Sequence, residues 1–92
     1  MINNINAYAY INGSGTDTTQ VFTGACTLVA VTLNTNGGTA TIVDGKTTAT
    51  TPVVGKIATD APEGTFTYNA SLATGLKIIL SGSPDITVTY RL

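Results

Sequence analysis

The chain has 92 residues, a formal net charge of −1, no histidine and one cysteine. We therefore expect one domain, residues 1–92, with a thin core and with neither an internal disulfide nor a zinc cluster. Its few basic residues are spread along the chain, which argues against a nucleic-acid partner and against binding to a charged membrane surface. Threonine is the most frequent residue, and its β-branched side chain favours strands.

The first predicted strand is the segment INAYAYIN, residues 5–12. Its strict alternation predicts that Ile5, Ala7, Ala9 and Ile11 face one way while Tyr8 and Tyr10 face the other. NGSGTD, residues 12–17, then breaks the pattern, and residues 19–24 form a short second strand.

Residues 25–34, ACTLVAVTLN, are the most apolar predicted strand. Uniform alternation places Val29, Val31 and Leu33 on one face and Cys26, Leu28 and Ala30 on the other. Apolar residues on both faces indicate a central strand, or one covered by another subunit. TNGG, residues 35–38, is typical of a hairpin turn, and residues 39–45 are the expected return strand.

The polar segment KTTATTP, residues 46–52, predicts a loop or an irregular edge. A strand is expected over residues 53–59, where Gly55 marks a bulge, and a turn over residues 60–64. Residues 65–70 alternate, with Phe66 and Tyr68 on one face, and residues 71–75 are a short connection.

The chain closes with two strands, residues 76–80 and 86–90, which we expect to pair as a hairpin. Alternate residues of these two strands should lie on opposite faces, with one set of side chains buried in the core and the other set pointing outward. The inner set is Leu76, Ile78, Leu80, Ile86, Val88 and Tyr90, and the outer set is Lys77, Ile79, Thr87, Thr89 and Arg91. Because Ile79 is apolar on the outer face, it is a candidate subunit contact.

These elements amount to about eight short strands and no helix. Strands at this spacing predict an all-β protein with a single small antiparallel β-sandwich. Jelly-roll-like and Greek-key wiring both remain open.

No arrangement of residues points to catalysis, so we do not expect an enzyme. Cys26 lies within a strand and has no histidine to activate it, which favours a structural thiol. The carboxylates lie in predicted turns, where they cap the backbone, and they match no calcium-binding loop; they are Asp17, Asp44, Asp60, Glu63 and Asp85. We expect no metal and no cofactor.

The first residues, MINNINAYAY, have no positively charged n-region and no apolar h-region, so we expect no signal peptide. No apolar run approaches the length of a membrane span, so no membrane partner is expected either.

Two segments, VFTGACTLVAVTLNTNGGTATIVDG and GLKIILSGSPDITVTYR, carry a family resemblance in their order and spacing across residues 21–91. Together they resemble small β-sandwich structural proteins of tailed bacteriophage virions, of the head decoration or cement type. The resemblance implies a non-enzymatic protein on the outer surface of the capsid. It implies a homotrimer bound to the assembled major capsid protein, which stabilises the head, and it contributes no catalytic residue.

The N-terminal residues 1–15 lie outside this resemblance, and we interpret them as a strand or arm that contacts a subunit or the capsid. The candidate contact residues are Ile5, Tyr8, Tyr10, Ile11, Ile79 and Arg91. The alternative is a tail, fibre or carbohydrate-binding module that contacts the host surface. In that case the stacking residues would be Tyr8, Tyr10, Phe66 and Tyr68, although the absence of tryptophan argues against it.

Overall fold

The computed structural model describes residues 6–12 and 17–92, and these residues form eight strands and no helix. The strands are β1 (Asn6–Asn12), β2 (Asp17–Thr23), β3 (Cys26–Thr35), β4 (Gly38–Asp44), β5 (Val53–Ile57), β6 (Gly64–Leu72), β7 (Gly75–Gly82) and β8 (Asp85–Arg91). The predicted all-β class is therefore confirmed.

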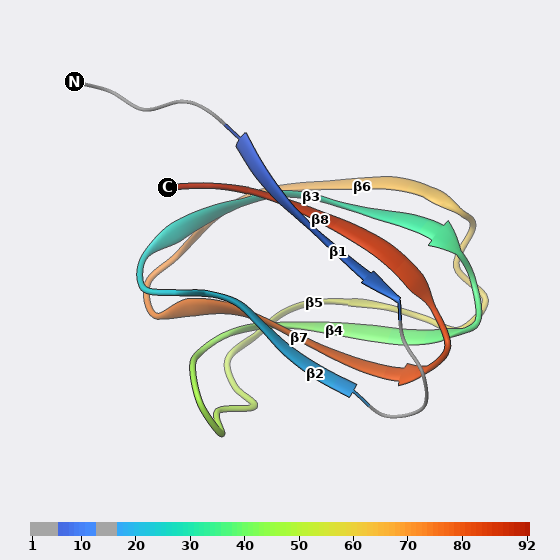
Figure 1. The fold of residues 1–92 in the computed structure, drawn as a ribbon, viewed down its shortest axis with the longest axis horizontal. Coiled ribbons are helices and arrows are strands. Elements are labelled where there is room, and N and C mark those ends of the chain that lie inside the picture. Colours follow the sequence, from blue (N-terminus) through green and yellow to red (C-terminus); the bar gives the residue numbers. More distant parts are fainter. Residues whose placement is uncertain (1–5, 13–16) are drawn as a thin grey trace.

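The strands form two four-stranded sheets that lie face to face (Figure 1). Sheet A has the order β1-β8-β3-β6, and sheet B has the order β2-β7-β4-β5. Every strand pairing in both sheets is antiparallel. The predicted antiparallel sandwich is therefore present.

The pairing follows a simple rule, in which β1 pairs with β8, β2 with β7, β3 with β6 and β4 with β5. This is the pattern of one long hairpin that has been rolled up, so that successive pairs fall alternately in sheet A and sheet B. An eight-stranded double sheet of this kind is a jelly roll. The topology decides between the two wirings that the sequence left open.

Both hairpins expected from the sequence are wrong as pairings. β7 and β8 lie in different sheets, and so do β3 and β4. Gly82 takes a left-handed backbone conformation, with φ of 88°, which turns the chain across the sandwich instead of back along its own sheet. The Ser83 N–H donates to the Gly37 carbonyl at 2.9 Å. This bond joins the β7–β8 connection to the β3–β4 connection, and both connections cross from one sheet to the other.

The predicted inner face of the closing strands is nevertheless confirmed. Leu76, Ile78 and Leu80 of β7 face Ile86 and Val88 of β8 across the sandwich, and all five are essentially inaccessible. Tyr90 is partly buried against them. The buried cluster comprises Ile11, Cys26, Leu28, Val31, Leu33, Ala40, Ile42, Ile57, Leu72, Leu76, Ile78, Leu80, Ile86 and Val88.

The predicted division of β3 into two opposite faces is wrong. Cys26 and Leu28 belong to the same buried cluster as Val31 and Leu33. The register of β3 shifts between Leu28 and Ala30, against both β6 and β8. This bulge around Val29 reverses the alternation of the strand. Before the bulge the even-numbered residues face the core, and after it the odd-numbered ones do, so apolar residues occupy both sets of positions.

On the β5–β6 side of the sandwich, the aromatic ring of Tyr68 packs directly against Gly55. A Cβ atom at Gly55 would lie 2.6 Å from the Tyr68 ring, so only glycine leaves room for that ring. The pairing of β5 with β4 is irregular next to Gly55. Ile42 pairs with Gly55 but the next residue, Val43, pairs with Val53, so one residue of β5 is left without a partner in β4. The bulge predicted at Gly55 is thus confirmed.

Candidate functional site

The described part of the chain offers surfaces and no enclosed site. It contains no pocket, and no group of three or more metal-ligating side chains gathers among residues 6–12 and 17–92. The candidate surfaces are the outer faces and the edges of the two sheets.

The outer face of sheet A is the largest continuous candidate, because its four strands bring polar side chains into register. One row across the sheet is Tyr10, Thr87, Thr32 and Thr65, and the next is Tyr8, Thr89, Ala30 and Thr67. A third row is Asn6, Arg91, Thr27 and Ser71. Only Arg91 is charged in these three rows, so the face is rich in hydroxyls and nearly neutral.

Hydrogen bonds between strands order the side chains at one end of this face. The Thr32 and Thr65 hydroxyls lie 3.1 Å apart. Asn34 Nδ2 donates to Thr87 Oγ1 at 3.1 Å and to Asp85 Oδ1 at 3.2 Å. The Tyr10 hydroxyl donates to Asp85 Oδ2 at 2.7 Å. A partner would meet side chains that are already held in place, which reduces the entropy lost on binding.

Two exposed tyrosines mark the β1 edge of the same face. Tyr8 is 74% exposed and Tyr10 is 59% exposed, whereas Ile11 on the opposite side of the strand is 7% exposed. The predicted alternation of this strand is therefore confirmed for residues 7–11. Tyrosine is enriched at protein contact surfaces, so this exposed pair is a candidate contact.

The structure separates the predicted contact residues into different environments. Tyr8, Tyr10 and Arg91 lie on the outer face of sheet A. Ile11 belongs to the core, and Ile5 lies outside the described residues. Ile79 lies on sheet B, half-buried between Thr18 of β2 and Thr41 of β4, so it does not extend the sheet A surface.

The four aromatic residues proposed for sugar stacking do not form one platform. Phe66 and Tyr68 are partly buried against the core on β6, at the far edge of sheet A from β1. Burial also raises the pKa of the Tyr68 hydroxyl. Only Tyr8 and Tyr10 remain as an exposed aromatic pair.

Cys26 has the environment of a structural thiol. It is buried in the core cluster, and desolvation, reinforced by the nearby Asp44 carboxylate, raises the pKa of the thiol. A raised pKa keeps the sulfur protonated and poorly nucleophilic.

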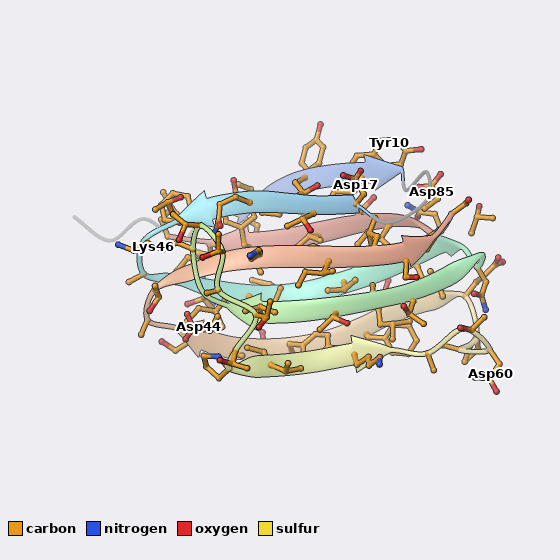
Figure 2. All side chains as sticks on the ribbon, turned by 90° about the horizontal axis from the view of Figure 1, so that it is seen from below. Tyr10, Asp17, Asp44, Lys46, Asp60 and Asp85 are labelled. Atoms are coloured by element: carbon orange, nitrogen blue, oxygen red, sulfur yellow. The ribbon has the colours of Figure 1, made fainter. Side chains whose placement is uncertain are left out.

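Asp44 serves the backbone of a turn. Its carboxylate accepts hydrogen bonds from the N–H groups of Ala73 at 3.0 Å, Thr74 at 2.8 Å and Gly75 at 3.2 Å. These bonds, that of Ala73 foremost, hold the pKa of Asp44 below its usual value although partial desolvation opposes them. Asp44 lies at the opposite end of the molecule from Tyr10 and Asp85 (Figure 2).

Lys77 is a buried cation that the sequence analysis did not single out. It is 4% exposed, and its Nζ donates to the carbonyls of Thr47 at 2.7 Å and Ala49 at 2.6 Å. Alternation placed Lys77 on an outer face, correctly, but nothing in residues 46–52 indicated that this loop would cover it. Its role here is to fasten the loop to sheet B.

No protein-family model, no curated protein and no solved structure matches the chain. Among the residues that the structure describes, no helix could cross a membrane.

Proposed function

We propose that this protein is a non-enzymatic structural protein of a virion. It binds the assembled major capsid lattice through the outer face of sheet A and stabilises the head. The observation that carries the proposal is the broad, nearly neutral face whose three rows of side chains end on Asn6, Tyr8 and Tyr10 of β1.

The chemistry of this face suits a permanent protein contact. Hydroxyl and amide groups can exchange water for hydrogen bonds to a partner without the desolvation cost of charged groups. The whole chain has no histidine, so no side chain with an ordinary pKa titrates near neutral pH. The contact should therefore depend little on pH or on salt between pH 6 and 8.

A repetitive lattice would strengthen a modest contact. A protein that binds only the assembled lattice stabilises it by mass action, and many identical copies add avidity. The capsid itself is suggested by the resemblance of residues 21–91 to decoration proteins, because the face alone specifies only a protein-like partner. Jelly rolls occur in viral capsid proteins and also in lectins, so the fold by itself does not choose between these roles.

The test is co-sedimentation of the purified chain with phage capsids that lack a decoration protein. Thr67→Lys puts a charge on the outer face of sheet A, on its edge strand β6, and Thr18→Lys puts the same charge on the outer face of sheet B, on its edge strand β2. We expect binding by the wild type and by Thr18→Lys, and at least about tenfold weaker binding by Thr67→Lys. Equal binding by both variants would exclude the sheet A face.

The exposed pair Tyr8 and Tyr10 favours a second candidate, a carbohydrate contact. Two tyrosines two residues apart on one strand face could stack against a sugar. Isothermal titration against host-surface glycans tests this candidate. Saturable binding that Tyr8→Ala abolishes would support a contact with the host surface, and no saturable binding would exclude it.

A further inference from the structure

β1 differs from the other outer strands of the two sheets because its edge is not interrupted. The register of β2 shifts between Gln20 and Phe22, and β5 and β6 show shifts against their neighbours as well. β5 also carries the exposed Lys56. Bulges and charged residues of this kind protect a sheet edge from pairing with another strand.

β1 has neither form of protection. It pairs with β8 over seven consecutive residues, Asn6 to Asn12, with no register shift, and this segment contains no charge and no proline. In the described part of the chain, no strand pairs with the other side of β1. An uncharged, regular edge strand is a template for one more strand.

The sequence of β1 reads nearly the same in both directions. NAYAYIN has Ala9 at its centre, tyrosine at positions 8 and 10, asparagine at positions 6 and 12, and apolar Ala7 and Ile11 between them. An antiparallel pair of identical strands places each residue opposite its counterpart across the centre. A two-fold contact must be self-complementary in this way.

We propose that two copies of this protein associate through β1, antiparallel and centred on Ala9. Tyr8 of each copy then lies opposite Tyr10 of the other, and Ala7 lies opposite Ile11. Aromatic residues that lie opposite each other on the exposed face stabilise a strand pair. The two A sheets become one continuous eight-stranded sheet.

Backbone geometry permits this register. In an antiparallel strand, the N–H and C=O of one residue point to the same side, and successive residues alternate. Centring on Ala9 pairs even-numbered residues only with even-numbered ones, and odd only with odd. The groups of β1 that point away from β8 therefore meet the corresponding groups of the second copy.

This inference does not rest on the proposed capsid role, and it predicts a different symmetry from the trimer implied by the family resemblance. The first test is sedimentation of the wild-type chain from about 1 µM to about 1 mM, a range that covers weak dimers. We expect a monomer–dimer equilibrium of the 9.4 kDa chain. A monomer throughout this range, or a trimer, would overturn the proposal.

A pair of charge variants tests the register. Because the tyrosines are exposed, both variants should fold, which circular dichroism checks. Tyr8→Lys/Tyr10→Lys places like charges opposite each other. We expect the dissociation constant of this dimer to be at least about tenfold higher than that of the wild-type dimer. Tyr8→Glu/Tyr10→Lys differs only at position 8 and places Glu opposite Lys, so it should dimerise. Equal behaviour of the two variants would contradict this register.

Cross-linking gives a readout that does not depend on affinity. We expect a mixture of Tyr8→Cys and Tyr10→Cys proteins to form a disulfide-linked heterodimer under mild oxidation. Either protein alone should cross-link several-fold less, because the equivalent positions are then diagonal rather than opposite. Equal cross-linking in all three samples would rule out pairing centred on Ala9.

Discussion

At the scale of single residues, two polar side chains fasten loops at sheet B. Asp44 accepts three backbone N–H groups of the β6–β7 turn, and Lys77 donates to two carbonyls of the loop over residues 45–52. In both cases a side chain satisfies backbone groups that the irregular chain cannot pair by itself. Neither residue has a geometry that suggests catalysis.

Asp44→Ala should lower the free energy of unfolding by about 1–3 kcal/mol at pH 7, because it removes the acceptor of these bonds. The folded-state pKa of Asp44 is lowered from its ordinary value of 3.8. Its contribution is therefore complete above that value and is lost as the pH falls through the folded-state pKa. Urea unfolding of both proteins from pH 7 to pH 2 should show the difference shrinking below about pH 4.

Asp60→Ala is the matched control, because Asp60 is an exposed carboxyl in the loop between β5 and β6. It should leave the free energy of unfolding nearly unchanged. An Asp44→Ala penalty that persists undiminished at pH 2 would show that the charge of Asp44 is not what holds the turn.

Lys77→Met should loosen the loop over residues 45–52 while the sandwich stays folded, because methionine fills much of the volume but cannot donate to Thr47 and Ala49. Trypsin cuts after the exposed Lys46 in this loop. We expect cleavage there to become several-fold faster, as measured by mass spectrometry. Lys56→Met, at an exposed lysine of β5, should leave that rate unchanged; an unchanged rate in Lys77→Met as well would refute the fastening role.

At the scale of strands, the sequence was informative about faces and much less so about partners. Alternation predicted correctly that Leu76, Ile78 and Leu80 face the core. It could not distinguish a hairpin within one sheet from a crossing between two sheets, because both bury the same faces. That choice depends on the backbone at Gly82 and on the bond from Ser83 to Gly37.

The bulge in β3 shows a second limit of pattern reasoning. Uniform alternation assigned Cys26 and Leu28 to one face and Val31 and Leu33 to the other, yet all four are buried together. A strand that is apolar in both phases could equally be buried on two sides, so the local sequence does not locate the bulge. The outer face of sheet A could not be predicted for the same reason. Its composition depends on which strands pair, as Thr32 does with Thr65, and no local pattern specifies these pairings.

Leu80→Ala should cost about 2–5 kcal/mol of unfolding free energy, because Leu80 is 1% exposed between the two sheets. Leu92→Ala makes the same change at a side chain that is 62% exposed, and it should cost little. Chemical denaturation of the two variants compares them directly. A cost near zero for Leu80→Ala would mean that β7 presents its other face to the core.

Gly55→Ala should destabilise the β5–β6 side by about 1–3 kcal/mol, because the new methyl group would overlap the Tyr68 ring. Combining it with Tyr68→Ala should cost less than the sum of the two single changes, because the second substitution removes the clash. A thermal-unfolding double-mutant cycle measures this coupling. Additive effects would show that ring and glycine do not constrain each other.

At the scale of the whole molecule, the described residues form a jelly roll with two candidate contact surfaces. The outer face of sheet A is broad, polar and nearly neutral, and we propose that it contacts the capsid lattice. The β1 edge is narrow and self-complementary, and we assign it to a second copy. Since the face and the edge meet at Tyr8 and Tyr10, pairing of two copies would nearly double the continuous surface offered to a lattice.

The most direct test of the proposed function is a binding isotherm of the wild-type chain on intact capsids and on unassembled capsid protein. We expect binding to intact capsids to saturate at a fixed ratio of chains to capsid subunits, with no measurable binding to unassembled subunits. We also expect the decorated heads to withstand a higher temperature. No saturable binding to capsids, or equal binding to unassembled subunits, would contradict a role as a protein that recognises and stabilises the assembled lattice.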